Sequence, residues 1–293
     1  MEKIYLSDAG PKVSPAIYGF YRWTEQDCKQ NLMEHVVNHC IELGINTFDH
    51  ADIYGGYQVE ERFGKLIKEK SIKRDDIVLF SKCGRVVPHA SMPHVKVDYK
   101  DTSKEHIIKS VENSLKKLNT DYIDIYLLNG LDPLSNLEET AQALQNLKDT
   151  GKIKNIGVVN FSVFQHQLLA SYLRAPIVSN HIELNLLNVD ALNNGQLDYI
   201  KQRYMRPLAT APLAEGKIAL SDDPKAIRLR NVLEAIAPKY HTDIETVAVA
   251  WLIQLGALPL IGTTNIDRIK HIVAAFSIEL DRQDWYALYS VTQ

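Results

Sequence analysis

Three side chains that together can transfer a proton follow two neighbouring apolar runs of this sequence. Asp49 ends one run, Tyr54 follows it, and Lys82 ends the next. A phenol has a pKa of about 10 and is a weak acid at neutral pH. An ammonium group beside it lowers that pKa, and a carboxylate holds the ammonium charged and oriented. The trio is a candidate general acid for a substrate oxygen, and a structural ion pair beside a packing tyrosine is the alternative.

A second candidate site lies near the C-terminus, where Gly262, Thr263, Thr264, Asn265 and Arg268 follow an apolar run and lead into a helical pattern. The free N–H groups of a helix N-terminus bind phosphate, and hydroxyl and guanidinium groups add to this. The alternative is an ordinary helix cap provided by Thr264 or Asn265.

The pattern of apolar residues alternates between strands and helices along the whole chain. Eight strand and helix units are the number that closes a (β/α)8 TIM barrel, in which chemistry sits on the loops after the strands. An open doubly wound sheet is the rival, but its G-x-G-x-x-G turn is absent. The predicted strands are 16–18, 47–49, 77–82, 122–128, 153–159, 177–183, 206–211 and 257–261. The predicted helices are 27–43, 59–69, 104–118, 137–150, 162–173, 190–203, 224–240, 244–254, 266–275 and 281–291.

Composition places the chain among ordinary globular proteins. Its 293 residues are 45% hydrophobic and 24% charged, with a net charge of −3, so we expect no nucleic-acid partner. No apolar run approaches the roughly 20 residues that span a bilayer. Three cysteines without a C-x-x-C pair indicate reduced thiols and a cytoplasmic protein. We expect residues 1–293 to form one barrel domain and the protein to be a monomer.

The run from Phe48 to Gln58, FDHADIYGGYQ, followed by Glu60 and Phe63-Gly64, closely resembles the small bacterial members of the aldo-keto reductase superfamily. Similar pieces recur from residue 18 to about 275, including Lys82-Cys83-Gly84. The resemblance implies a (β/α)8 barrel that reduces an aldehyde or ketone to an alcohol without a metal. It also implies NADP as the cofactor, with NAD less expected, and a small carbonyl compound as the substrate.

The resemblance assigns roles position by position. Tyr54 matches the proton donor, and Lys82 and Asp49 match the residues that tune it. The expected cofactor-binding residues are Asn160, His181 and Ala211 at the nicotinamide, Leu213, Gly216 and Lys217 over the pyrophosphate, and Thr263, Thr264, Asn265 and Arg268 at the adenosine phosphates. Tyr21, Arg22 and Trp23 match the aromatic lining of the substrate pocket.

Several positions depart from the family pattern, and they cluster around the nicotinamide and the carbonyl. Asn129 replaces the usual histidine, His181 a glutamine, Thr210 the aromatic ring that stacks on nicotinamide, and Gly262 a lysine. Asparagine still donates an N–H bond but cannot ionise. These departures indicate either a carbonyl reductase with a retuned pocket or a catalytically impaired nucleotide-binding homologue that acts as a sensor or partner. A third reading makes Lys82 the Schiff-base lysine of an aldolase.

Two weaker signals remain. The segment 84–102 is long for a barrel loop, and we expect it to form part of the substrate pocket, with an ordered surface excursion as the alternative. Cys83 follows Lys82 directly, and strand alternation predicts that its thiol points away from the ammonium.

Overall fold

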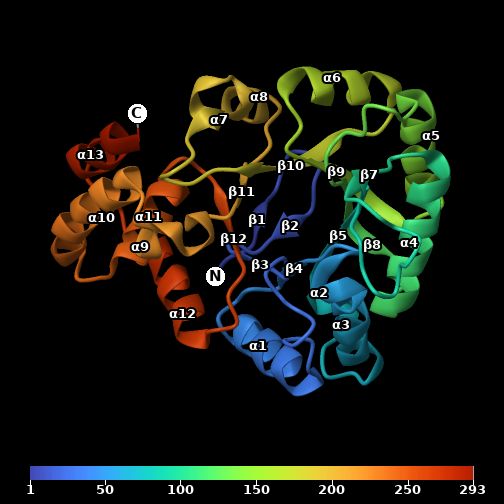
Figure 1. Cartoon of the computed structure of the whole chain (residues 1–293), viewed down its shortest axis with the longest axis horizontal. Coiled ribbons are helices and arrows are strands. Elements are labelled where there is room, and N and C mark those ends of the chain that lie inside the picture. The colour runs from blue at the N-terminus through green and yellow to red at the C-terminus, as the bar shows by residue number, and fades with distance from the viewer. Residues whose placement is uncertain (293) are drawn as a thin grey trace.

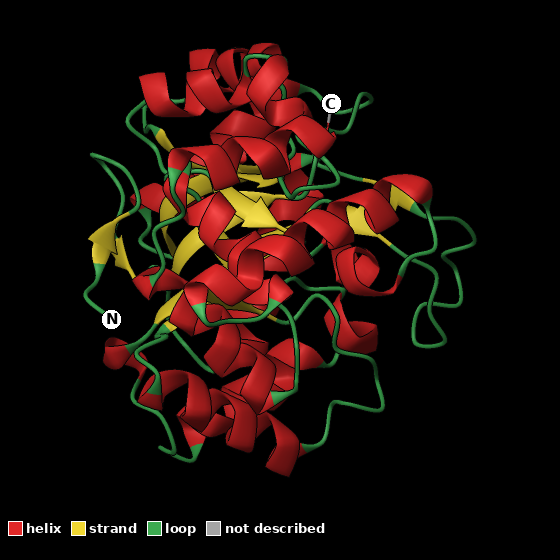
Figure 2. Ribbon diagram, turned by 90° about the vertical axis from the view of Figure 1, so that its left-hand side faces the viewer, coloured by secondary structure: helices red, strands yellow, loops and turns green. Residues whose placement is uncertain are grey.

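Eight parallel strands form a closed barrel in the computed structural model, which describes residues 1–292. Helices surround this barrel, as the ribbons in Figure 1 and Figure 2 show. The barrel strands follow chain order, and the last pairs with the first through Leu260 and Ile17. The predicted (β/α)8 TIM barrel is therefore confirmed. The barrel strands are β3 (Ile17–Gly19), β4 (Thr47–Asp49), β5 (Val78–Cys83), β8 (Ile123–Leu128), β9 (Ile153–Val159), β10 (Ile177–Glu183), β11 (Leu208–Thr210) and β12 (Leu258–Ile261).

The ten predicted helices are present and differ from the predicted ranges mainly at their ends, whereas the four-residue helices α2 (Tyr54–Tyr57) and α9 (Lys217–Leu220) were not predicted. The first predicted helix begins at Gln30 and not at residue 27, because the Asp27 carboxylate accepts from the backbone and hydroxyl of Thr24 in a turn of its own. The predicted helix 190–203 is split in two at Gly195, whose φ is +79°. The helices are α1 (Gln30–Glu42), α2 (Tyr54–Tyr57), α3 (Val59–Lys68), α4 (Lys104–Leu118), α5 (Leu137–Asp149), α6 (Val163–Tyr172), α7 (Asp190–Asn193), α8 (Gln196–Gln202), α9 (Lys217–Leu220), α10 (Pro224–Ile236), α11 (Ile244–Gln254), α12 (Ile266–Ala274) and α13 (Arg282–Thr292).

Strand alternation divides the apolar side chains between two cores. On β8, Ile125 and Leu127 belong to a cluster inside the barrel, and Tyr126 and Leu128 belong to the larger cluster between barrel and helices. Successive residues of a strand point to opposite faces, so most barrel strands supply both cores; β4 supplies only Phe48, to the outer one. Cys83 lies in the outer cluster, which confirms that it points away from the barrel interior.

An N-terminal hairpin, formed by β1 (Ile4–Tyr5) and β2 (Lys12–Val13), was not predicted. Leu6 and Val13 from this segment pack with Ile17 and Val78, so the hairpin closes one end of the inner core. The hairpin lies near the N-terminus in Figure 2. Its strands are two residues long, which is too short for a period-2 pattern to reveal.

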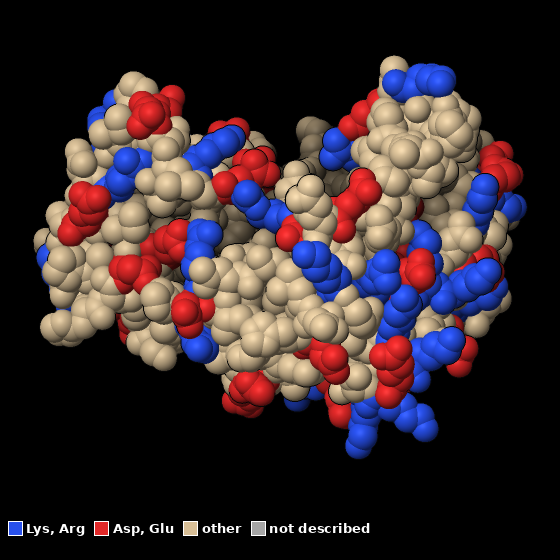
Figure 3. All heavy atoms as spheres, turned by 60° about the horizontal axis from the view of Figure 1, so that its bottom comes forward, with Lys and Arg blue, Asp and Glu red and all other residues tan. Residues whose placement is uncertain are grey.

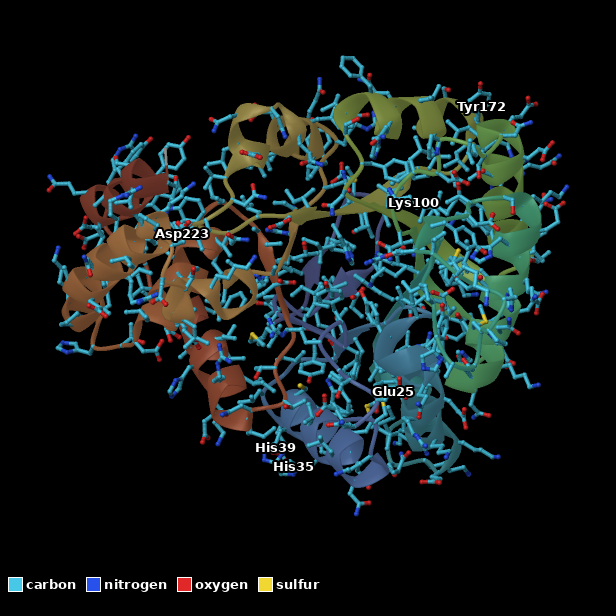
Figure 4. All side chains as sticks on the ribbon, in the orientation of Figure 1. Glu25, His35, His39, Lys100, Tyr172 and Asp223 are labelled. Carbon is cyan, nitrogen blue, oxygen red and sulfur yellow. The ribbon has the colours of Figure 1, made fainter. Side chains whose placement is uncertain are left out.

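The outer surface carries mixed charge. Basic and acidic side chains are interspersed over the face in Figure 3, in keeping with the small net charge. His35 and His39 lie on the outer side of α1 (Figure 4). Among residues 1–292, no helix is long and apolar enough to cross a bilayer. The three cysteines are free and buried.

Candidate active site

Asp49 and Lys82 form a buried ion pair at the ends of β4 and β5. The Lys82 Nζ donates to Asp49 Oδ1 at 2.7 Å, to Asp49 Oδ2 at 2.6 Å and to the His50 carbonyl at 2.8 Å. The two side chains are 4% and 0% exposed. The ammonium also lies over the Tyr54 ring, 5.1 Å from its centroid. The sequence predicted that these three side chains lie together, and in the structure they are in contact.

The electrostatic effect on Tyr54 is opposite to the one that the sequence suggested. Burial raises the pKa of Tyr54 well above its ordinary value, and the Asp49 charge raises it further. The expected lowering by Lys82 is wrong because all three ammonium protons are directed at Asp49 and His50 and the carboxylate offsets the charge. Burial also raises the pKa of Asp49 and lowers the pKa of Lys82. The charge of Lys82 opposes the shift at Asp49, and the charge of Asp49 opposes the shift at Lys82. Tyr54 is therefore a neutral, protonated phenol.

A tight left-handed turn holds Tyr54 in place. Gly55 and Gly56 have φ values of +54° and +61°, and a Cβ on Gly55 would lie 2.5 Å from the Cys28 sulfur. Only glycine fits such a turn without strain. The next residue, Tyr57, accepts from the Val87 N–H at 3.1 Å and donates to the Val87 carbonyl at 2.8 Å. The turn is thus fixed to β4, to the loop before α1 and to the segment after β5.

Tyr54 and Lys82 line a cavity that measures about 1080 Å3 and lies at the carboxyl ends of the strands. Most of the predicted site residues line this one cavity: Tyr21, Arg22, Tyr54, Lys82, Asn129, Asn160, His181, Ala211, Leu213, Gly216, Lys217, Thr263, Thr264 and Arg268. This volume suits a ligand somewhat larger than a drug-sized molecule.

Two of the predicted site residues, Trp23 and Asn265, do not line the cavity. Trp23 is 3% exposed, packs on Phe20 and donates its indole N–H to the Tyr18 hydroxyl, so it is a core residue and not a wall of the pocket. Asn265 caps α12 by accepting from Asp267 and Arg268 N–H groups, and it is absent from the cavity lining. The predicted role of Trp23 is wrong because neighbours along a loop can face opposite directions, whereas the cofactor-binding role of Asn265 stays a prediction.

The nicotinamide end of the expected cofactor site holds a buried histidine. His181 is fully buried, and neither ring nitrogen has a hydrogen-bond partner; its Nδ1 is 3.9 Å from Asp49 Oδ1. Burial, followed by the Lys82 charge, lowers the pKa of His181 well below its usual value, so the ring is neutral. Asn160 accepts from the Glu183 N–H through Oδ1, which leaves its amide N–H2 to donate. These groups fit the carboxamide of a nicotinamide, although Thr210 offers no ring to stack on it.

The opposite end offers donors for phosphates. This end is lined by Thr263, Thr264, Lys217 and Arg268, and by Gly216, whose φ of +89° is a left-handed value that favours glycine. A set of hydroxyl, ammonium and guanidinium donors suits the oxygens of a dinucleotide. The residues at both ends therefore fit a nicotinamide dinucleotide.

The loop after β10 was missed by sequence reasoning. It lines the cavity with polar side chains from Glu183, Asn185, Asn188, Asp190 and Asn193. Its place after a barrel strand, together with its density of amides, was the signal that could have found it. From the segment 84–102 only Arg85 lines the cavity, so the expected contribution of that segment to the pocket is largely wrong.

One cavity of the TIM barrel is lined by a protonated tyrosine beside a buried Lys–Asp pair, and by hydrogen-bond donors that suit a dinucleotide. These are the features of an oxidoreductase. The sequence model of the Aldo/keto reductase family matches residues 17–293, and the chain belongs to this family. The chain is 36% identical over 296 residues to an uncharacterized oxidoreductase, YcsN, of Bacillus subtilis (strain 168), covering 100% of this chain and 98% of that relative. It is 35% identical to a 6-dehydroglucose reductase of Agrobacterium fabrum, covering 99% and 98% of the two chains. A crystal structure of the thermostable aldo-keto reductase Tm1743 in complex with the inhibitor epalrestat aligns with a TM-score of 0.83 at 25% identity, covering 99% and 100%.

Proposed function

We propose that this protein reduces a carbonyl compound to an alcohol, with NADPH as the expected hydride donor and Tyr54 as the proton donor. The observation that carries the proposal is the protonated Tyr54 phenol in the wall of the cavity, beside the buried Lys82–Asp49 pair. The bound dinucleotide would supply the hydride. The side chains around the carbonyl would position the substrate and supply the proton.

Tyr54 would donate its hydroxyl proton to the carbonyl oxygen as negative charge develops there. Its raised pKa keeps the proton in place until the substrate oxygen becomes basic. Lys82 lies against the ring, 5.1 Å from its centroid, and would hold the phenol in position. Asp49 holds Lys82 in position and does not itself line the cavity.

Asn129 would serve as a second donor to the carbonyl oxygen. Its backbone N–H donates to the Cys83 carbonyl, which fixes the residue at the cavity wall. An amide donates a hydrogen bond without titrating, so we expect turnover to lack the ionisation of a histidine near neutral pH.

A polyhydroxylated carbonyl compound is a suitable substrate to test first. Amide and carboxylate side chains from the loop after β10, among them Asn188 and Asp190, line the cavity and can bind hydroxyl groups. The relative in Agrobacterium fabrum named 6-dehydroglucose reductase supports this choice.

The test is oxidation of NADPH in the presence of a nitrobenzaldehyde and a panel of sugar aldehydes and ketones. Tyr54→Phe should abolish turnover while leaving dinucleotide binding intact. Tyr172→Phe is a matched control, since Tyr172 lies on the outer side of α6, 48% exposed, outside the cavity lining (Figure 4).

One outcome supports a second candidate function. Asn129 and Thr210 stand where the family has a histidine and an aromatic ring, and both line the cavity. Dinucleotide binding by the wild type without turnover of any carbonyl compound would indicate a nucleotide-binding homologue that acts as a sensor or partner.

A further inference from the structure

Arg268, at the expected phosphate end of the cavity, is already bound by a carboxylate. Its Nε donates to Glu245 Oε2 at 3.0 Å and its Nη2 donates to Glu245 Oε1 at 2.6 Å. The guanidinium is 41% exposed and the carboxylate 20% exposed. Arg268 lies on α12 and Glu245 on α11, two helices that pack against each other (Figure 1). Two parallel N–H···O bonds are the geometry with which arginine binds a carboxylate or a phosphate.

On α11 and α12 the charges near Arg268 are paired with one another, and Arg22 and Lys217 are among the other basic side chains that line the cavity. Lys270 pairs with Asp267 at 3.2 Å, and the His271 imidazole lies 2.9 Å from Asp243. Carboxylates therefore outnumber lysine and arginine side chains on this part of α11 and α12. Gly262, at the start of the same loop, carries no side chain.

We propose that Glu245 determines the cofactor specificity of this protein by occupying Arg268. The inference rests on the proposed binding of a nicotinamide dinucleotide. The 2′-phosphate of NADPH carries between one and two negative charges at neutral pH, whereas NADH has a hydroxyl there. A phosphate that reaches Arg268 must share the guanidinium with Glu245 or displace it, and it meets like charge in either case. A hydroxyl meets no such repulsion, so NADH and NADPH bind with similar affinity.

The alternative role for Glu245 is to position Arg268 for the phosphate. The two roles predict opposite results when the charge is removed and the shape is kept. If Glu245 opposes the phosphate, Glu245→Gln frees the guanidinium and strengthens NADPH binding. If it positions Arg268, the same change weakens NADPH binding.

The experiment measures the dissociation constants of NADPH and NADH by fluorescence, and those of adenosine 2′,5′-bisphosphate and AMP by calorimetry. In the wild type we expect the NADPH and NADH constants to agree within about tenfold. Glu245→Gln should tighten NADPH and the bisphosphate by about tenfold and leave NADH and AMP within about twofold. Asp267→Asn is a matched control, because it removes the same charge from the same corner without a bond to Arg268. In an Arg268→Gln background, the gain from Glu245→Gln should disappear.

A weaker or unchanged NADPH affinity in Glu245→Gln overturns the inference, and so does an equal gain in Asp267→Asn. Neither result contradicts the proposed reductase activity, because the experiment measures dissociation constants and not turnover. Failure of the wild type to bind either dinucleotide would overturn both proposals.

Discussion

The buried Lys82–Asp49 pair allows a quantitative prediction about stability. Lys82→Met removes the ammonium and leaves Asp49 in a site where its side chain is 0% exposed. An exposed ion pair contributes about 0–1 kcal/mol, but removal of one partner of a buried pair costs about 3–5 kcal/mol. Three hydrogen bonds of 2.6–2.8 Å are lost together, so we expect the free energy of unfolding to fall by an amount in the upper range.

The loss should depend on pH, with a sign set by Asp49. Burial raises the pKa of Asp49, and Lys82 is the first cause that opposes this shift. Without Lys82 the folded carboxyl retains a proton that the unfolded chain releases at a pH of about 4. A carboxyl whose folded pKa is raised makes its full contribution to stability only below its unfolded pKa. As the pH rises above the unfolded pKa, the free energy of unfolding falls by up to about 1.4 kcal/mol per pH unit. Lys82→Met should therefore lose more stability at about pH 8 than at about pH 5.

Urea unfolding followed by circular dichroism at both pH values measures the effect. The double variant Asp49→Asn, Lys82→Met tests the coupling, because it leaves neither charge without a partner. It should lose less stability than the sum of the single variants, by roughly 1–3 kcal/mol. Strict additivity, together with an equal loss at both pH values, would refute the conclusion that the pair is buried and charged.

Three further predictions concern other parts of the molecule. Gly64→Ala should lower the free energy of unfolding by about 1–3 kcal/mol, because the new Cβ would lie 2.0 Å from the Lys117 carbonyl; a change below about 0.5 kcal/mol in urea unfolding would contradict the close packing of α3 on α4. Burial, with the Glu60 charge, raises the pKa of Asp52 to about 8, so the folded state loses stability as pH rises above the unfolded pKa of about 4. Asp52→Asn should therefore melt at a higher temperature than the wild type at about pH 9 and at the same temperature near pH 4, and equal melting curves at both would count against the raised pKa of this carboxyl. Asn129→His should raise turnover of small aldehydes by about tenfold or more and add an ionisation to the pH profile, and an unaltered rate and profile would show that this position does not contact the carbonyl.

The barrel itself was predictable from the sequence. Seven of the eight barrel strands lie within one residue of the predicted bounds at both ends, because β-branched runs and helical periods are local properties of the chain. The hairpin β1–β2 and the break at Gly195 escaped prediction, since a two-residue strand and a single left-handed residue leave almost no periodic signal.

The candidate site was predictable in part. Parallel strands end at the same rim, so the residues after β4, β5 and β12 had to approach one cavity. The direction of individual side chains could not be read in this way. Trp23 turns into the core and Asn265 into a helix cap, whereas their neighbours Arg22 and Thr264 face the cavity.

The sequence by itself determined that a phenol, an ammonium and a carboxylate meet at the mouth of a barrel. Only the tertiary structure decided what those groups do to one another. A pKa depends on solvent exclusion and on the direction of each hydrogen bond, and the bonds from Lys82 to Asp49 and His50 changed the expected sign at Tyr54. The pairing of Arg268 with Glu245 has the same origin, because two helices bring together charges that lie 23 positions apart in the chain.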